Sequence, residues 1–278
     1  MSFDNPSTDR LIVLARGLGT RMRKPADQAD LDAKQAQIAD TGIKAIIPID
    51  RPFLDYVLTV VADAGYRRVC MVIGPEHTVL RDYYQKLSGG RLEIGFAIQD
   101  QPLGTANAVA AAEQWTVGEA FAMINSDNYY PPEALKALRH TPAPGVALFD
   151  RDAMLAGSNI PADRIEKFAI GQIEGDRLVR IVEKPSPDQM QQVAAAGGGR
   201  LYLSMNAWLF DASIFDACRA IPKSARGEYE ITDAVQYSID QLGKTFTIAP
   251  VNAAVLDLSS RTDIEPVAQR LRGTEVRL

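Results

Sequence analysis

The sequence predicts an α/β protein with a mostly parallel, Rossmann-like sheet, helices on both faces, and a small β-rich subregion. Up to about residue 150, short β-branched runs alternate with longer segments that carry apolar residues at helical spacing. This pattern is typical of a parallel sheet covered by helices. After Asp150, two extended segments flank a turn, which indicates an antiparallel hairpin. Because no linker or repeat interrupts the chain, residues 1–278 are predicted to form one domain with halves at 1–150 and 151–278.

The elements of the first half follow from this alternation. Apolar, β-branched runs predict five strands, at residues 11–15, 68–73, 92–98, 120–125 and 145–149. Between them, apolar residues spaced three and four apart predict helices at 53–61, 79–87 and 105–115.

The second half begins with the hairpin. Segments 165–170 and 178–182 flank the turn-like Glu174-Gly175-Asp176. A polar stretch ending in three glycines follows. The remaining elements are a strand at 201–210, helices at 212–220 and 231–242, a strand around 244–248 and a helix at 262–271.

The composition is that of an ordinary globular protein and excludes several classes of function. The chain is 46% apolar and carries 30 basic against 35 acidic side chains, a net charge of −5. It lacks the basic excess that non-specific nucleic-acid binding needs. No run approaches the roughly 18 apolar residues that span a bilayer, and the polar start lacks the apolar core of a signal peptide. Cys70 and Cys218 suit buried reduced thiols, so a cytoplasmic protein is expected.

The exception to the acidic balance is a basic cluster at a glycine turn. Arg16, Arg21, Arg23 and Lys24 fall within nine residues, directly after the first predicted strand. The two glycines of the turn free the backbone for close approach of a ligand, and exposed amides in such turns bind anions. The dinucleotide fingerprint G-x-G-x-x-G needs a small residue where this chain has Met22, so a nicotinamide site is disfavoured. On spacing alone, a surface turn with solvated basic side chains explains the cluster equally well.

Residues 14–22, which read L-A-R-G-L-G-T-R-M, resemble the signature of the sugar-1-phosphate nucleotidylyltransferases, whose loop wraps the triphosphate of a nucleotide. Arg16 stands where the family often has a small residue and adds charge beside the expected nucleotide. The resemblance implies a catalytic role for Arg21. It also implies nucleotide binding by the loop residues Leu14, Ala15, Gly17, Leu18, Gly19 and Thr20.

A second segment of the family pattern surrounds Lys44. Residues 43–49 and the helix start that follows resemble the family's second signature, in which a lysine precedes an apolar run. The resemblance implies that Lys44 supports the phosphates. Ile43 and Ala45 replace the prolines that flank this lysine in the family. The chain before Lys44 is longer than usual, and the helical composition of residues 27–40 predicts a flap over the site.

A third segment runs from Gln101 to Ala106, after a strand and before a helix. In related enzymes the glutamine side chain and the glycine backbone read the base, because an amide offers a donor and an acceptor to an imide edge. The resemblance therefore implies nucleotide binding by Gln101, Gly104 and Thr105, with Gln99 as the alternative glutamine.

Acidic and polar residues farther along complete the resemblance. Asp127 follows a predicted strand, and a carboxylate at the C-terminal end of a parallel strand faces the crevice where such sheets bind ligands. The resemblance implies that Asp127 and Asp233 hold Mg²⁺. It also implies that the β-rich subregion binds the sugar. The sugar-phosphate-binding residues are then Asn128, Glu183, Lys184 and Asn206, with Lys184 also catalytic.

Together these matches imply an enzyme that condenses a nucleoside triphosphate with a hexose 1-phosphate to give an NDP-sugar and pyrophosphate. UTP or dTTP and glucose 1-phosphate are favoured, and Mg²⁺ is the implied cofactor. Both reactants are anions, so hard oxygen ligands on a metal and fixed cations are the appropriate groups. The partners are the two substrates, with neither nucleic acid nor a membrane. Family members commonly form homo-oligomers, so the resemblance also implies a possible homo-oligomer for this chain.

Three other functions stay open at this point. A non-catalytic relative would bind a nucleotide or sugar phosphate as a regulatory subunit, although such a protein is expected to lose an aspartate or the loop arginine. A nicotinamide-dependent oxidoreductase is weakened by Met22, and a cytidylyltransferase for a non-sugar acceptor lies within the same class. His77 and His140 have no metal-ligand spacing and are predicted at the surface. The residues leave the base, the sugar, the oligomeric state and any allosteric regulation undecided.

Overall fold

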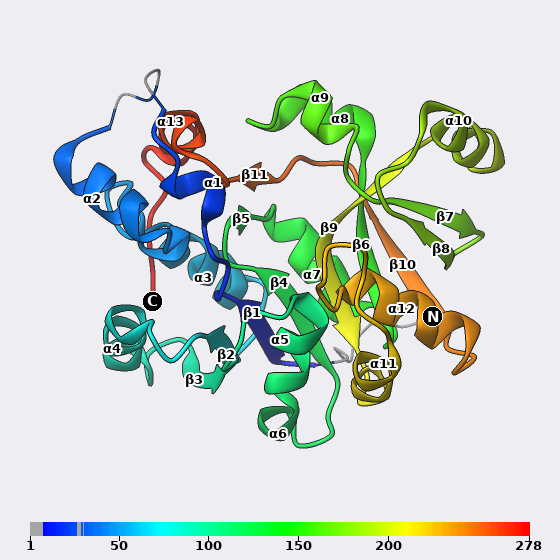
Figure 1. Ribbon diagram of the computed structural model, residues 1–278, viewed down its shortest axis with the longest axis horizontal. Helices are drawn as coiled ribbons and strands as arrows, with labels where there is room; N and C mark the ends of the chain where they lie inside the picture. The colour runs from blue at the N-terminus through cyan, green and yellow to red at the C-terminus, as the bar shows by residue number, and fades with distance from the viewer. Residues whose placement is uncertain (1–7, 27–28, 30) are drawn as a thin grey trace.

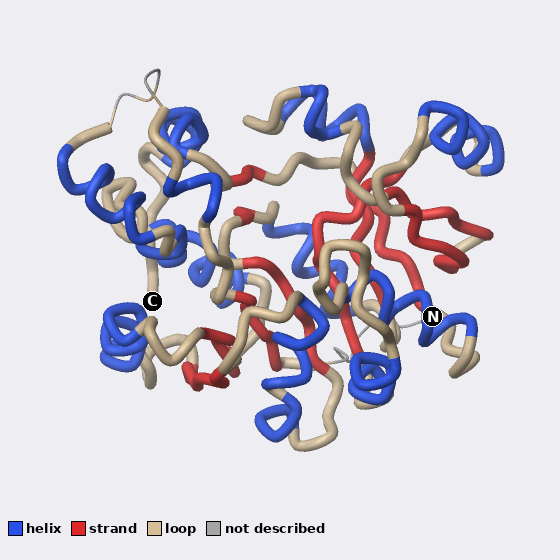
Figure 2. The backbone as a smooth tube through the Cα atoms, viewed as in Figure 1, coloured by secondary structure: helices blue, strands red, loops and turns tan. Residues whose placement is uncertain are grey.

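A computed structural model describes residues 8–26, 29 and 31–278. Within them the fold is mixed α/β, with a central nine-stranded sheet and helices on both of its faces (Figures 1 and 2). The strand order is β3 (Glu93–Ile98), β2 (Arg68–Ile73), β1 (Arg10–Leu14), β4 (Phe121–Asn125), β9 (Tyr202–Phe210), β6 (Gly145–Asp150), β10 (Phe246–Val251), β8 (Arg177–Val182) and β7 (Ile170–Glu174). A second, two-stranded sheet pairs β5 (Asn128–Tyr129) with β11 (Leu256–Asp257).

The helices connect these strands and flank the sheet. In chain order the helical elements are α1 (Thr20–Arg23), α2 (Ala33–Thr41), η1 (Lys44–Ile46), α3 (Phe53–Asp63), α4 (Thr78–Leu87), α5 (Thr105–Ala111), α6 (Glu113–Thr116), α7 (Pro132–His140), α8 (Arg151–Gly157), α9 (Ala162–Ile165), α10 (Pro187–Ala196), α11 (Ile214–Ala220), α12 (Ile231–Asp240), η2 (Arg261–Asp263) and α13 (Ile264–Leu271). Among residues 8–26, 29 and 31–278, no helix has both the length and the apolar character required to cross a bilayer.

Strands β1 to β4 form the parallel part of the sheet. Strand β2 lies between β1 and β3, and β4 lies on the other side of β1. Strand β9 enters antiparallel to both β4 and β6, and β10 runs parallel to β6. The C-terminal ends of β1 to β4 therefore open at one edge of the sheet, which is where ligands bind in sheets of this type.

The side chains of β1 show how both faces are covered. Leu11 and Val13 belong to the apolar core that includes α3, α4, α7 and α13. Ile12 belongs to the core on the other face, which includes α5, α11 and α12. All three side chains are fully buried. Because successive side chains of a strand point to opposite faces, a strand covered on both sides is apolar at every position.

The predicted hairpin is confirmed as β7 and β8, with Gly175 at a φ of 62° in its turn. The predicted extended segment 165–170 is wrong, because α9 ends at Ile165 and β7 begins only at Ile170. Ile165 and Phe168 stand three positions apart, a spacing that suits a helical turn better than strand alternation.

The predicted flap lies partly outside the described residues, which omit 27–28 and 30. The rest includes α2, so the helical composition of this segment is confirmed. Helix α2 is capped by Asp32, whose carboxylate accepts from the Gln35 backbone N–H at 2.7 Å. It packs against α1 and η1, and none of its described residues lines either of the pockets below. The structure thus places α2 beside the loop instead of over the site.

Candidate functional site

The loop after β1 passes very close to the segment before Lys44. Gly19 has a φ of 60°, and a Cβ there would lie 2.1 Å from the carbonyl oxygen of Gly42. Only glycine allows this conformation and this approach. A Cβ at Gly17 would meet nothing within 4 Å. Gly19 therefore holds the loop in place, whereas the backbone of Gly17 stays open toward a ligand.

A pocket of about 350 Å³, called here the nucleotide-side pocket, opens at the C-terminal ends of the parallel strands. Most of the residues predicted to bind the nucleotide or its phosphates line it: Leu14, Ala15, Gly17, Leu18, Thr20, Lys44, Gly104, Thr105 and Asp127. Gly19 faces Gly42 instead of the pocket. The loop, the lysine and the aspartate thus come together from segments far apart in the chain.

The glutamine in this pocket is Gln99, the alternative residue, and not Gln101. Gln99 is buried, and its backbone N–H continues the ladder to the Ile73 carbonyl at 2.9 Å. Its Nε2 donates to the Gly104 carbonyl at 3.0 Å and to Asn107 Oδ1 at 2.8 Å. Gln101 lies two residues farther along, exposed and outside the pocket. The strand ladder therefore decides which glutamine reaches the site.

Gly104 joins the two halves of the molecule at the site. Its φ is 112°, and a Cβ would lie 2.5 Å from the carbonyl oxygen of Tyr229. The Tyr229 N–H donates to the Leu103 carbonyl at 2.7 Å, and the Ile231 N–H donates to Thr105 Oγ1 at 2.8 Å. These contacts hold the loop that contains Gly104 against the segment that precedes α12.

Lys44 and Asp127 form a close ion pair, with 2.5 Å between Nζ and Oδ2. Burial lowers the pKa of Lys44, but the charges of Asp127 and Asp257 more than offset this, so the pKa lies above its ordinary value. The ammonium group is therefore held in its charged form beside the carboxylates. A fixed cation of this kind suits a site that binds phosphates.

Asp257 is the second carboxylate beside Asp127, a residue that the sequence reasoning missed. In the β5–β11 pair, Asp257 stands opposite Asn128, and the Leu258 N–H donates to the Asp127 carbonyl at 2.8 Å. Burial raises the pKa of Asp257 to about 6, and the negative charge of Asp127 adds to the rise. Arg164 forms an ion pair with the same carboxylate.

The predicted pairing of Asp127 with Asp233 stays a prediction. Asp233 lies in the first turn of α12. Burial raises its pKa, the charge of Glu230 adds to this, and Arg226 opposes it. Like Asp257, it lines neither pocket, although the preceding Ile231 and Thr232 line the larger pocket described below. An acid in the first turn of a helix also interacts favourably with the helix dipole.

Asn128, predicted to bind the sugar phosphate, is also placed differently. It is buried, and its Nδ2 donates to Asp257 Oδ1 at 3.0 Å. Its Oδ1 accepts from Asn125 Nδ2 at 3.3 Å. The amide therefore orients the carboxylate of Asp257 instead of facing a pocket. Such supporting hydrogen bonds are a regular feature of metal-binding carboxylates.

The carboxylates of Asp127 and Asp257 fit Mg²⁺ by the chemistry of their donors. Mg²⁺ prefers oxygen ligands and is often held by one or two carboxylates together with substrate phosphates. The described residues contain no group of three or more His, Cys, Asp or Glu side chains arranged for a metal, so a metal here would depend on oxygen atoms of the substrate. A cation would also offset the repulsion that contributes to the raised pKa of Asp257.

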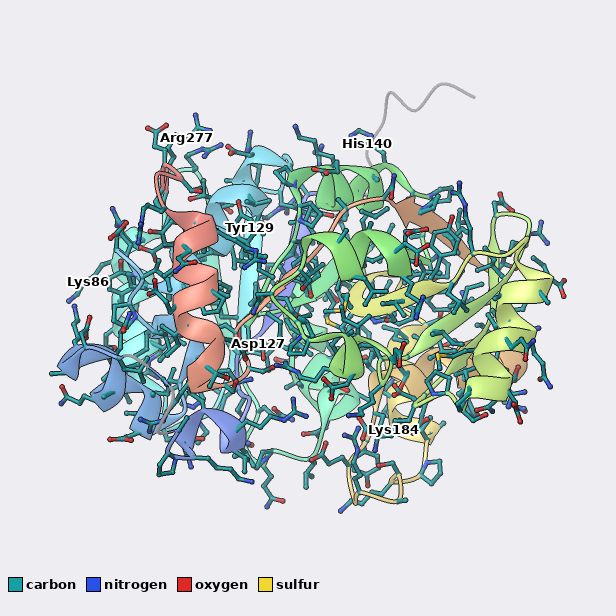
Figure 3. All side chains as sticks on the ribbon, turned by 90° about the horizontal axis from the view of Figure 1, so that it is seen from above. Lys86, Asp127, Tyr129, His140, Lys184 and Arg277 are labelled. Carbon is teal, nitrogen blue, oxygen red and sulfur yellow. The ribbon has the colours of Figure 1, made fainter. Side chains whose placement is uncertain are left out.

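A larger pocket of about 810 Å³, called here the sugar-side pocket, adjoins the first. Thr105 and Glu228 line both pockets, so the two spaces meet at these residues. Besides Thr105, four predicted site residues line the larger pocket: Arg21, Glu183, Lys184 and Asn206. Figure 3 shows Asp127 near the middle of the molecule and Lys184 in the neighbouring half, with His140 on the opposite side.

The backbone at Lys184 and Asn206 is strained. Both are non-glycine residues with positive φ, 44° and 55° respectively. Such conformations cost about 1–2 kcal/mol for most residues, and strain of this kind clusters at functional sites. Asn206 Oδ1 accepts from Trp208 Nε1 at 3.2 Å, which fixes the orientation of the amide. The remaining cations of the pocket are Arg164, Lys167 and Arg226.

Comparison with known proteins gives a consistent result. The profile of a family described as "Nucleotidyl transferase" matches residues 38–252. A UTP–glucose-1-phosphate uridylyltransferase of Haloferax volcanii is 24% identical over 94% of this chain and 96% of its own length. A glucose-1-phosphate thymidylyltransferase of Streptomyces griseus is 28% identical over 83% of this chain. The match covers only 57% of that relative, and a glycan-biosynthesis nucleotidyltransferase of Haloferax volcanii is covered to 66%.

Two solved structures share the fold. A UDP-glucose pyrophosphorylase complexed with UDP-glucose has a TM-score of 0.70 at 18% identity, covering 96% of this chain and 100% of its own. An inositol-1-phosphate CTP transferase from T. maritima has a TM-score of 0.71 at 15% identity, covering 96% and 98%.

Proposed function

The chain belongs to the nucleotidyl transferase family, and from this premise we propose that it is a sugar-1-phosphate nucleotidylyltransferase. The proposed substrates are a nucleoside triphosphate, UTP or dTTP before others, and a hexose 1-phosphate, glucose 1-phosphate before others. The observation that carries the proposal is the pair of adjoining pockets that share Thr105 and Glu228. Each can take one anionic substrate, and cations and carboxylates from both halves meet between them.

In the proposed reaction, an oxygen of the sugar phosphate attacks the α-phosphorus of the nucleotide. A bond forms between them, and the bond from the α-phosphorus to the bridging oxygen breaks. Pyrophosphate leaves with that oxygen and its electron pair. No general base is needed, because the attacking phosphate is already ionised at neutral pH. The protein contributes positioning and stabilisation of charge.

Each residue has a proposed role that follows from its position in the two pockets. The open backbone at Gly17 and the neighbouring loop amides cradle the triphosphate. Lys44 supports the phosphates beside Asp127, and Arg21 lies on the sugar side, where its charge reaches the departing pyrophosphate. Lys184 aligns the attacking phosphate. Asp127 and Asp257 would hold Mg²⁺, which when bound supplies charge neutralisation for the phosphate oxygens.

The contacts of the sugar are proposed from the sugar-side pocket. Glu183 accepts from the hydroxyl groups of the hexose, and Asn206 offers the Nδ2 that the Trp208 contact leaves available. The larger volume of this pocket accommodates a hexose with room for solvent. These roles follow the family resemblance of the residues together with their position along one wall.

The test is pyrophosphate release from a panel of nucleoside triphosphates with glucose 1-phosphate and other hexose 1-phosphates, in the presence of Mg²⁺. We expect release with at least one pair and none with the Asp127→Asn variant as a matched control. Release that requires CTP and a non-sugar phosphate would redirect the substrate assignment. Silence across the whole panel, with binding retained, would favour a non-catalytic regulatory relative.

A further inference from the structure

Arg16 is the cation of the nucleotide-side pocket that the proposed reaction leaves without a role. It lines the pocket next to Gly17, and 9% of the residue is exposed. Its Nη2 lies 3.4 Å from both carboxylate oxygens of Glu76, at the long end of the hydrogen-bond range. Nε and Nη1 are buried and have no hydrogen-bond partner among the described residues. Unpaired buried donors are costly, so an acceptor entering the pocket would stabilise this side chain.

The turn after β2 packs closely against the Arg16 guanidinium. A Cβ at Gly74 would lie 2.5 Å from Arg16 Nε and 2.4 Å from Glu76 Oε2. The φ of Gly74 lies outside the left-handed region, so a larger residue here would only have to displace the ends of the Arg16 and Glu76 side chains. His77, predicted at the surface, is buried beside the same turn. Burial lowers its pKa despite the nearby Glu76 carboxylate, so it adds no positive charge that could replace Arg16.

Arg16 and Gln99 line the same pocket and each follows a strand that pairs with β2. The Ala15 N–H bonds to the Val72 carbonyl at 2.9 Å, and the Gln99 N–H bonds to the Ile73 carbonyl at 2.9 Å. Strand β2 thus carries Arg16 on one side of its C-terminal end and Gln99 on the other.

Two groups proposed to handle phosphate, Lys44 and Asp127, lie on the other side of β1. The Ser126 N–H bonds to the Leu14 carbonyl at 3.1 Å, across β1 from β2. This places Asp127 and its partner Lys44 on the β4 side of the pocket. A nucleotide with its phosphates at that side directs its base toward Arg16.

The hydrogen-bond pattern of Gln99 defines what the base must offer. Both donors of its amide are used, by the Gly104 carbonyl and by Asn107 Oδ1. The group left for a ligand is therefore the acceptor Oε1. Arg16 offers only donors, because a guanidinium has no acceptor. A ligand that satisfies both must carry an N–H next to a carbonyl oxygen.

Resting on the proposed function, we propose that Arg16 is a specificity-determining residue of the nucleotide site. Its guanidinium donates to a keto oxygen of the base, while Gln99 Oε1 accepts from the adjacent ring N–H. Uracil, thymine and guanine present this imide-type edge. Adenine lacks the keto oxygen, and cytosine lacks the ring N–H. The site therefore selects keto bases through a charged side chain, in addition to the glutamine.

The experiment measures binding by calorimetry, without turnover. Wild type, Arg16→Met and Arg16→Lys are titrated with the Mg²⁺ complexes of UTP, dTTP, GTP, ATP and CTP, and with inorganic tripolyphosphate. We expect Arg16→Met to weaken the preferred keto nucleotide by about tenfold or more, as loss of a hydrogen bond to a charged donor does. Binding of ATP and of tripolyphosphate should change little. Arg16→Lys should also lose affinity, because lysine lacks the planar fork, and it serves if the methionine variant does not fold.

Glu76→Gln is the matched control, since it removes the ion pair but leaves Arg16 in place. We expect it to keep the nucleotide affinity and the base preference. An equal loss for tripolyphosphate and nucleotides in Arg16→Met would overturn the proposal in favour of a phosphate contact. So would an unchanged base preference, or a loss in Glu76→Gln as large as in Arg16→Met. Absence of turnover with every sugar phosphate would contradict the proposed function and leave the binding result to decide this inference separately.

Discussion

The nucleotide-side and sugar-side pockets are built in different ways. The first lies at the ends of parallel strands, and its walls include the backbone at Gly17 and Gly104 and buried side chains such as Gln99. The second includes exposed charged side chains such as Lys184 and Lys167 beside buried ones such as Ser204. The shape of a pocket formed by backbone atoms changes little when side chains are substituted. The ligand preference of a pocket lined by long side chains changes with each of them. We therefore expect substitutions in the nucleotide-side pocket to change the chemistry and those in the sugar-side pocket to change the acceptor.

The largest expected effect comes from the carboxylates proposed to hold Mg²⁺. Asp127→Asn and Asp257→Asn should each lower kcat by about 10²-fold or more, because each removes a charge that positions the metal and phosphates. Asp233→Asn should keep kcat within a few-fold, since the charge of Asp257, and not that of Asp233, acts on Lys44 and lies beside Asp127. Pyrophosphate release at saturating substrates measures all three.

Thermal unfolding of the same variants provides the control. Asp257→Asn also disturbs the ion pair with Arg164, so its stability must be compared with that of Asp127→Asn before kcat is interpreted. If Asp233→Asn were inactive and well folded while Asp257→Asn were active, the assignment of the second carboxylate would be wrong.

Lys184→Ala tests whether the two pockets act independently. It should raise KM for the sugar 1-phosphate by about tenfold or more, as loss of a charge-assisted contact does, and leave KM for the nucleotide nearly unchanged. Lys167→Ala is the control, because Lys167 is paired with Asp163 at 3.1 Å and 69% of its side chain is exposed. A rise in the nucleotide KM alone would show that Lys184 contacts the nucleotide and not the sugar phosphate.

Gln99→Leu and Gln101→Leu test the nucleotide-side pocket. The first should weaken nucleotide binding by about tenfold and lower the preference for keto bases, because it removes the buried acceptor. The second should have no measurable effect, because Gln101 is exposed and outside the pocket. Nucleotide titrations by calorimetry compare the two; equal losses would mean that the loop rearranges on binding and brings Gln101 to the base.

The smallest expected effect is on the pH dependence of metal binding. The pKa of Asp257 is raised to about 6 by burial and by the charge of Asp127. The carboxyl is therefore ionised above this pH and increasingly protonated below it. Mn²⁺ affinity, measured by electron paramagnetic resonance, should fall about fourfold between about pH 7.5 and about pH 5.5, because a proton then competes with the metal. Asp257→Asn should show a shallower dependence; a wild-type affinity independent of pH would contradict the raised pKa.

The parallel half was predictable because its signals are local. Runs of apolar residues predicted the strands. Asp127 was recognised as a site residue because it directly follows one of them. The same signal exists at Asp257, which follows the apolar Val255-Leu256. It was missed because β11 has two residues and pairs only with β5. So short a strand shows no alternation, and its partner lies far away in the chain.

Other features depended on tertiary contacts that the sequence does not display. The choice between Gln99 and Gln101 is made by the hydrogen bond to β2. The antiparallel entry of β9 between β4 and β6 joins the two halves of the sheet. In contrast, α8 and α10 carry recognisable caps that could have been found. Asp150 accepts from two backbone N–H groups at the start of α8, and Ser186 forms a capping box at the start of α10.

The central claim is that the two pockets bring a nucleotide and a sugar phosphate together for transfer of the nucleotidyl group. The most direct test follows ³²P from α-labelled and, separately, γ-labelled nucleoside triphosphate in the presence of a hexose 1-phosphate and Mg²⁺. We expect the α-label to appear in an NDP-sugar and the γ-label in pyrophosphate. Label from the γ-position in the sugar product, or release of α-label as a nucleoside monophosphate without sugar, would contradict it.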